Sequence, residues 1–149
     1  MKINKTIISL IILVLTMFFS VNSSYAVPPK TNLLPSDYTT GITWEKALKI
    51  KKPIIVNFYV DWCGYCRRFA PVLENLRKEY ESKFTFVIIN TDDPKNEKLV
   101  NSFMIKSFPS LFFVNPKNGR RVFVNQSIYL KPDLKKELDD FLKDYKNSK

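Results

Sequence analysis

The fold of this chain is decided by one continuous stretch, Val56-Asn57-Phe58-Tyr59-Val60-Asp61-Trp62-Cys63-Gly64-Tyr65-Cys66-Arg67-Arg68. An apolar run here ends in two cysteines separated by two residues. A strand that stops before Cys63, followed by a helix that starts there, would place Cys63 at the helix N-terminus. Free backbone N–H groups and the helix dipole stabilise an anion at that end, and the anion would be a thiolate, the reactive form of cysteine. Cys66 lies one turn later, so the stretch predicts a dithiol that cycles between reduced and oxidised states.

These residues resemble the active site of the thioredoxin superfamily, in which Trp62-Cys63-Gly64-Tyr65-Cys66 follows a strand. Pro71 matches the family's proline in the active-site helix, and Phe108-Pro109-Ser110 matches its cis-proline loop. The resemblance covers nearly all of the chain beyond its N-terminal segment. It implies an α/β thioredoxin fold, with a central mixed β-sheet flanked by helices on both faces.

Composition narrows the possible chemistry. The chain has 149 residues, enough for one domain, and a formal net charge of +10. It has no histidine, which excludes serine-type triads and histidine metal sites, and its two cysteines cannot form a four-cysteine zinc site. We therefore expect no metal and no cofactor. The aromatic and basic interleaving of a nucleic-acid site is not evident, so we expect no nucleic acid partner.

The N-terminal segment has the pattern of a secretory signal peptide. Lys2 and Lys5 precede an apolar core from Ile7 to Phe19, and Ser24-Tyr25-Ala26 has the small residues of a cleavage signal. The core is shorter than the about 20 residues of a membrane span. We expect a signal peptide over 1–26, an extended lead-in over 27–40, a thioredoxin-like domain over 41–149 and a periplasmic protein. The alternative is an uncleaved N-terminal membrane anchor that faces the periplasm.

Apolar periodicity and turn residues predict the remaining elements. Thr43 is expected to cap the first helix, and Pro71 is expected to kink the second. Nearly unbroken apolar runs predict strands buried on both faces, and spacing of three and four predicts helices. The expected helices span 44–50, 66–80, 95–103 and 132–145, and the expected strands span 54–60, 84–89, 110–114 and 121–125.

The resemblance also implies roles for single residues. Cys63, at the helix start, is the expected nucleophile and the more accessible thiol, and Cys66 is the expected buried resolving thiol. Phe108, which precedes Pro109, would offer its main chain to an extended substrate, and Trp62 and Tyr65 would add apolar contact. Gly64, between the cysteines, is expected to tune the site. We expect Asp61 to be exposed, with no acid–base role.

Asn57 departs from the family pattern. Thioredoxins carry a buried Asp at the matching position, which handles the proton of the second cysteine, and commonly a lysine partner on the next strand. Here these positions are Asn57 and Ile88. Both members of a buried charge pair are therefore absent together, which avoids a lone buried charge. Asn57 is expected to tune the site, but the proton acceptor for Cys66 is left unidentified.

These features predict a monomeric periplasmic thiol–disulfide oxidoreductase that reduces protein disulfides and is itself reduced by a membrane-bound electron donor. No histidine lies between the cysteines, which disfavours a strong oxidase. The Gly-Tyr dipeptide resembles that of periplasmic isomerases, so an oxidase or isomerase is the alternative within the enzyme class. A redox-inactive binding module that uses the groove near Pro109 is the alternative outside it. A structural disulfide is disfavoured, because so short a loop constrains the unfolded chain little.

Overall fold

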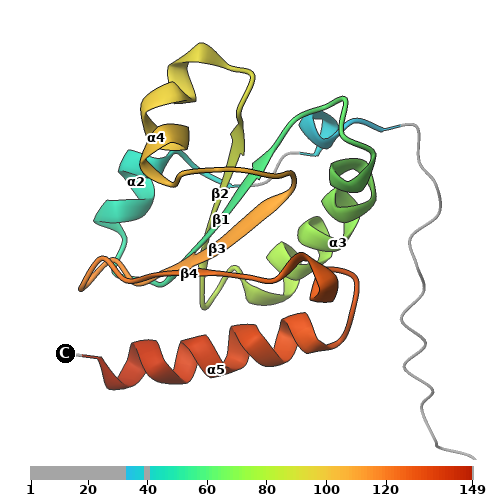
Figure 1. Cartoon of the computed structure of the whole chain (residues 1–149). Coiled ribbons are helices and arrows are strands. Elements are labelled where there is room, and N and C mark those ends of the chain that lie inside the picture. The colour runs from blue at the N-terminus through green and yellow to red at the C-terminus, as the bar shows by residue number, and fades with distance from the viewer. Residues whose placement is uncertain (1–32, 39–40, 149) are drawn as a thin grey trace, which may run out of the picture.

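A four-stranded mixed sheet forms the centre of the molecule (Figure 1). The computed structural model describes residues 33–38 and 41–148, so the predicted signal peptide and most of the lead-in lie outside the described residues. Strand order is β2-β1-β3-β4, with β1 parallel to β2 and antiparallel to β3, and β3 antiparallel to β4. The strands are β1 (Ile54–Tyr59), β2 (Thr85–Asn90), β3 (Ser110–Val114) and β4 (Arg121–Phe123).

Helices cover both faces of this sheet, as predicted (Figure 1). One face carries α3 (Gly64–Tyr80) and α5 (Asp133–Asn147), and the other carries α2 (Trp44–Lys49) and α4 (Glu97–Ser102). In β1, Ile55 packs in the core under α3 and α5, while its neighbours Ile54 and Val56 pack under α2 and α4. Alternate residues of a strand point to opposite faces, so the apolar run of β1 supplies both cores.

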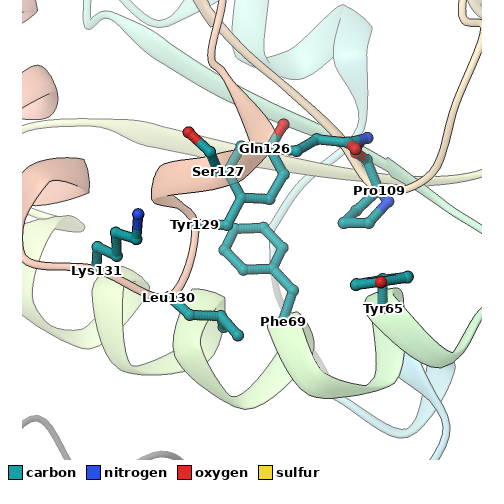
Figure 2. A pocket seen from close by; sticks show the side chains of 8 residues that line it. All are labelled: Tyr65, Phe69, Pro109, Gln126, Ser127, Tyr129, Leu130 and Lys131. Carbon is teal, nitrogen blue, oxygen red and sulfur yellow. Dashed lines mark hydrogen bonds between the residues drawn. The ribbon is translucent and has the colours of Figure 1, made fainter.

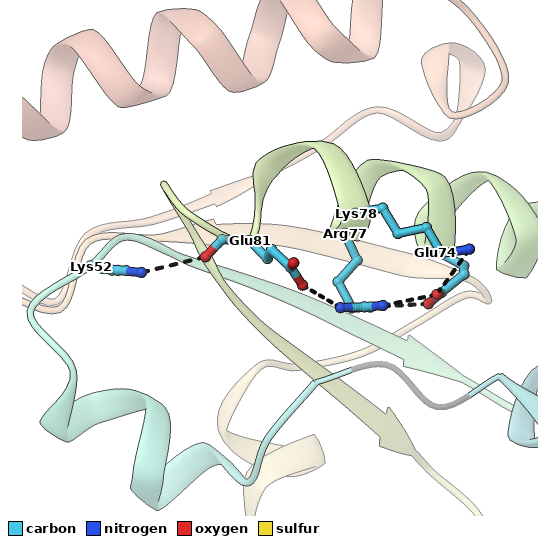
Figure 3. Close-up of polar contacts among 5 residues, drawn as sticks. All are labelled: Lys52, Glu74, Arg77, Lys78 and Glu81. Carbon is cyan, nitrogen blue, oxygen red and sulfur yellow. Dashed lines mark hydrogen bonds and ion pairs between the residues drawn. The ribbon is translucent and has the colours of Figure 1, made fainter.

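Helix α3 carries the site, and polar contacts fix its far end (Figure 3). Arg77 pairs with Glu74 through two hydrogen bonds, of 3.0 and 3.1 Å, and also pairs with Glu81. Lys52 Nζ donates to the carbonyl oxygen of Glu81 at 3.4 Å, just beyond the last helical residue. Pro71 lies inside a helix that is continuous from Gly64 to Tyr80.

Thr43 caps α2 as predicted, because its hydroxyl accepts the backbone N–H of Lys46 at 3.4 Å. The segment before it runs beside β2, where Ile42 N donates to Phe86 O at 2.8 Å. Gly41 has φ +98°, and a Cβ there would lie 2.5 Å from Phe86 O. Only glycine fits this close approach, which lets the chain lie against the sheet edge.

Several boundaries differ from the predicted ones because of short 3-10 turns. Pro35–Asp37 forms such a turn, so the lead-in is not extended throughout. Pro94–Asn96 forms another and delays α4, and Gln126–Ile128 forms a third after β4, which ends at Phe123 rather than 125. The side chains of Asp93 and Asn125 accept the N–H groups that open the last two turns. No helix within 33–38 and 41–148 has the length and apolarity that a membrane crossing requires.

Candidate active site

Cys63 lies at the N-cap of α3, immediately after the loop that leaves β1. Its sulfur accepts the backbone N–H of Cys66 at 3.2 Å. The expected strand, cysteine and helix order is therefore present, and the helix starts at Gly64. A negative charge on this sulfur would meet the positive end of the helix and a donated N–H group.

The two thiols are both largely buried, to different degrees. Cys63 is 9% exposed and Cys66 is 2% exposed. Both are in the free thiol form. Burial, and then the hydrogen bond with Cys63, raise the pKa of the Cys66 thiol to about 12. Cys63 is thus the more accessible of the pair, as expected, although little of it reaches the surface, and Cys66 stays protonated near neutral pH.

The Phe108–Pro109 loop lies against the first cysteine. The peptide bond between these two residues is cis, as predicted. The Cys63 thiol donates to the carbonyl oxygen of Phe108 at 3.7 Å, a long contact even for sulfur. Gln126 holds the loop from the other side, with its amide nitrogen 2.6 Å from Pro109 O and 3.0 Å from Ser107 Oγ. Backbone of the cis-proline loop is therefore within reach of a chain bound at Cys63.

Two large aromatic side chains flank Cys63 at the surface. Trp62 is 69% exposed and Tyr65 is 68% exposed. The indole N–H of Trp62 donates to Asp92 at 3.0 Å, and its ring lies edge-on to Phe108 with centroids 6.1 Å apart. No motif in the sequence points to this contact between residues 30 positions apart. The Asp92 carboxylate fixes the orientation of an exposed apolar ring beside the sulfur.

The loop before Cys63 is tied to the N-terminal turn. Asp61 is half-buried rather than exposed: its carboxylate accepts the N–H of Ser36 at 3.0 Å. Arg67 Nε donates to the Asp61 carbonyl at 2.8 Å, while Arg68 lies 4.3 Å from the centre of the Tyr65 ring. The expectation for Asp61 was wrong because the Pro35–Asp37 turn, distant in sequence, covers it.

Asn57 is buried, and its side-chain oxygen Oδ1 has no hydrogen-bond partner among the described residues. Ile88 lies opposite Asn57 on β2, as the family resemblance implied. Within the part of the chain that the structure describes, Tyr59 and Tyr129 interact with Cys66, and burial raises the pKa of both phenols. Neutral phenols cannot accept a proton, so these contacts supply no base for Cys66.

Gly64 faces open space, because a Cβ there would meet no atom within 4 Å. No close approach requires glycine at this position, and its expected tuning role stays a prediction. Residues 33–38 and 41–148 contain no cluster of three or more His, Cys, Asp or Glu side chains that could hold a metal ion.

A pocket of about 440 Å³ is lined by Tyr65, which lies between the two cysteines in the sequence, and by Pro109; the sequence predicted a groove near Pro109 but not its other walls (Figure 2). Tyr65 and Pro109 lie together on one side of it, and its other walls come from α3 and from the segment between β4 and α5. That segment has no motif, so only the fold reveals its part in the pocket. Its lining residues are Tyr65, Phe69, Pro109, Gln126, Ser127, Tyr129, Leu130 and Lys131.

Comparison with known proteins gives a consistent result. The sequence profile of the Thioredoxin family matches residues 36–143. Thioredoxin from Buchnera aphidicola subsp. Baizongia pistaciae is 35% identical over 107 residues, which are 72% of this chain and 94% of that protein. The chloroplast thioredoxin-like protein HCF164 of Arabidopsis thaliana is 31% identical over 106 residues, 70% of this chain. The chain spans only 38% of that relative's length.

A protein disulfide-isomerase of Medicago sativa is 31% identical over 86 residues, 57% of this chain and 17% of the relative. Among solved structures, the crystal structure of the J-Trx1 fragment of ERdj5 has a TM-score of 0.58 at 23% identity. The match covers 67% of this chain and 48% of that one. The predicted fold class, a mixed sheet with helices on both faces in the thioredoxin arrangement, is confirmed.

Proposed function

The chain belongs to the thioredoxin family, and from this premise we propose that it is a thiol–disulfide oxidoreductase that reduces protein disulfides through Cys63 and Cys66. The observation that carries the proposal is the placement of the Cys63 sulfur. It caps α3, accepts the Cys66 N–H and lies beside the Phe108 carbonyl. The sulfur therefore lies at the start of a helix and beside backbone that an extended chain can approach.

In the first step, the Cys63 thiolate attacks one sulfur of a substrate disulfide. The substrate S–S bond breaks, and the other substrate sulfur leaves with the electron pair as a thiolate. A mixed disulfide joins Cys63 to the substrate. Trp62 and Phe108, packed edge to face, form an apolar surface for the bound segment, and the Phe108 backbone offers hydrogen bonds to it.

In the second step, Cys66 loses its proton and attacks the Cys63 sulfur. This releases the second substrate thiol and leaves a Cys63–Cys66 disulfide, so two electrons have passed to the substrate. A side-chain hydrogen bond between the two cysteines, which holds the Cys66 proton, is one cause of the raised Cys66 pKa. Because the mixed disulfide removes the Cys63 thiol, the pKa of Cys66 falls at the moment it must attack, while the effect of burial persists.

The direction of electron flow and the cellular setting are part of the same proposal. We infer a periplasmic monomer, exported by a signal peptide over 1–26, that a membrane-bound donor reduces. Thioredoxin relatives support a reductase, while similarity to a protein disulfide-isomerase keeps the isomerase alternative open. N-terminal sequencing of the exported protein is expected to begin at Val27, and a retained Met1 in the membrane fraction would favour the anchored form.

Equilibration with glutathione tests the direction of electron flow. The Cys63–Cys66 pair of a reductase is expected to have a reduction potential below about −200 mV, whereas strong oxidases have potentials near about −120 mV. A value in the oxidase range would reverse the proposed direction without removing the dithiol chemistry.

Insulin reduction tests the activity itself. The reduced protein is expected to precipitate insulin chains much faster than dithiothreitol alone, and Cys63→Ser is expected to abolish the gain. Lys98→Ala, an exposed change on α4 away from the site, is the matched control and is expected to keep full activity. Wild-type protein that gives no gain over dithiothreitol would favour the redox-inactive binding module.

A further inference from the structure

A hollow of about 450 Å³ lies at the end of the sheet where β1 begins. Three segments form it: the end of α2 with the residues before β1, the turn between β3 and β4, and the last part of α5. Figure 1 shows these segments together on one side of the molecule and the start of α3 on the other. Because β1 has six residues, about 20 Å of sheet separates the hollow from the loop that carries Cys63.

Lysine side chains give this hollow a positive charge. Lys49, Lys51 and Lys117 line it, and no acidic side chain does. Within the part of the chain that the structure describes, the side chains of Lys49 and Lys51 form no hydrogen bond or ion pair. Asp144, which precedes a lining residue of α5, is already paired with Arg120 at 3.4 Å. The hollow therefore presents two ammonium groups that no described carboxylate neutralises.

Lys117 has a different part, because it ties two walls of the hollow together. Its ammonium group donates to the carbonyl oxygens of Tyr145 at 3.3 Å and Ser148 at 2.7 Å, at the C-terminal end of α5. It also lies 4.5 Å from the centre of the Tyr145 ring. A cation is favourable at the negative end of a helix. Lys117 thus fixes the wall, while the ammonium groups of Lys49 and Lys51 are left for an anion outside the protein.

Exposed apolar side chains alternate with these two lysines. Leu48 is 47% exposed and Ile50 is 39% exposed, and both line the hollow beside Lys49 and Lys51. Lysines and exposed aliphatic groups on one surface are typical of proteins that lie in the interface of a bilayer. There the ammonium groups meet lipid phosphates, while the aliphatic groups reach toward the acyl chains.

We propose that this hollow docks the protein on an anionic phospholipid surface, with Lys49 and Lys51 on lipid phosphates, Leu48 and Ile50 in the headgroup region, and Cys63 facing away from the membrane. Each phospholipid presents both partners that the hollow requires, a phosphate and an acyl chain. The formal net charge of +10 adds long-range attraction to such a surface. The inference goes beyond the proposed function and does not depend on the redox activity of Cys63.

Sedimentation with lipid vesicles tests the docking. The exported protein is mixed with vesicles of phosphatidylcholine alone, or of phosphatidylcholine and phosphatidylglycerol in equal parts. Wild type is expected to bind the anionic vesicles roughly tenfold or more tightly, as for a few lysines at a charged surface. Added salt should reduce this preference, because ions screen exposed charges. Equal binding to both kinds of vesicle, or binding to neither, would overturn the proposal.

Matched pairs of lysine variants locate the contact. Lys49→Gln with Lys51→Gln should weaken binding to anionic vesicles by roughly fivefold for each lysine. Lys95→Gln with Lys98→Gln removes the same charge from exposed positions beyond the C-terminal end of β2. This control should lose less than about twofold, because charges beyond the screening length of about 10 Å act weakly. All variants share the N-terminus of wild type, so it cannot cause a difference between them. Equal losses in the two pairs would overturn the docking site and leave attraction by net charge alone.

Two further measurements test the apolar contact and the orientation. Leu48→Gln should weaken binding, whereas Leu130→Gln, at another exposed leucine, should not. Full binding by Leu48→Gln would overturn the apolar part of the proposal. Alkylation of Cys63 by iodoacetamide should proceed at the same rate with and without anionic vesicles, because the docked hollow lies at the other end of the sheet. Slower alkylation on the vesicles would overturn the proposed orientation.

Discussion

The fold makes the Cys66 thiol hard to ionise. It is 2% exposed, and burial followed by the Cys63 hydrogen bond raises its pKa to about 12, from an ordinary value of 9.0. The folded state thus holds this proton more tightly than the unfolded chain. Its contribution to stability is fully present below pH 9 and is lost as pH rises toward 12.

The reduced protein should therefore lose about 1 kcal/mol of unfolding free energy from Cys66 alone between about pH 9 and pH 10. Urea unfolding at both pH values measures it, with reduced Cys66→Ser as the control that keeps Cys63. The variant should show a shallower decline. Equal slopes in the two proteins would mean that Cys66 titrates normally in the fold.

Asn57 also affects how Cys66 can lose its proton during resolution of the mixed disulfide. Its amide can orient a water or bond the sulfur but cannot take a proton, and the phenols near Cys66 are held neutral. Resolution of the mixed disulfide should then be slow near neutral pH and accelerate as pH rises, because more Cys66 becomes thiolate.

Asn57→Asp should speed this resolution step and lower stability, since the carboxylate enters a buried site opposite Ile88 without a cation. Stopped-flow measurement of resolution over a range of pH gives the rate, and a denaturation curve gives the stability. Asn57→Ser, which removes the amide but adds no base, is the control. An unchanged rate at every pH in Asn57→Asp would point to water as the acceptor.

At the scale of elements, α3 depends on its two ends. The N-terminal end presents Cys63, and the other end is held by Arg77 between Glu74 and Glu81 (Figure 3). The hydrogen bond from Arg77 lowers the pKa of the Glu74 carboxyl. The contribution of the Arg77–Glu74 pair to the free energy of unfolding is present above the ordinary carboxyl pKa of 4.5. It is lost as pH falls through the lowered pKa of Glu74.

Arg77→Gln should destabilise the protein by about 1 kcal/mol near neutral pH, the upper end for such pairs, because Glu74 and Arg77 are partly shielded. The difference from wild type should shrink in acid, where Glu74 is protonated. Denaturation at neutral and acidic pH measures it. Lys136→Gln, which breaks a more exposed pair with Asp140, should have a smaller effect. A loss that persists unchanged in acid would assign Arg77 a packing role instead.

Most helices and strands could be predicted from local signals in the sequence. Local signals placed them well: Thr43 caps α2, the run from Ile54 forms β1, and Cys63 caps α3. The turns at Pro35–Asp37 and Gln126–Ile128 were missed; Asn125 caps the second locally, but the contacts that tie both turns to the site are distant in sequence. Ser36 bonds Asp61, and Gln126 bonds the Pro109 loop. Such pairings have no local pattern to read.

At the scale of the whole molecule, the sheet brings three separate segments to one site. The junction between β1 and α3 carries Cys63, the loop before β3 carries Phe108, and the turn after β2 supplies Asp92 for Trp62. The first two were predictable because their motifs resemble the family. Asp92 and the pocket walls that include Tyr129 and Lys131 were not, because their roles arise only when the strands are in order.

The central claim is that Cys63 attacks a substrate disulfide and Cys66 resolves the intermediate. Mass spectrometry of single-cysteine variants tests it most directly, after reaction of the reduced variants with insulin. Cys66→Ser should accumulate a mixed disulfide between Cys63 and an insulin chain, and Cys63→Ser should give none. A stable adduct on Cys66 in Cys63→Ser, with no adduct in Cys66→Ser, would contradict the account.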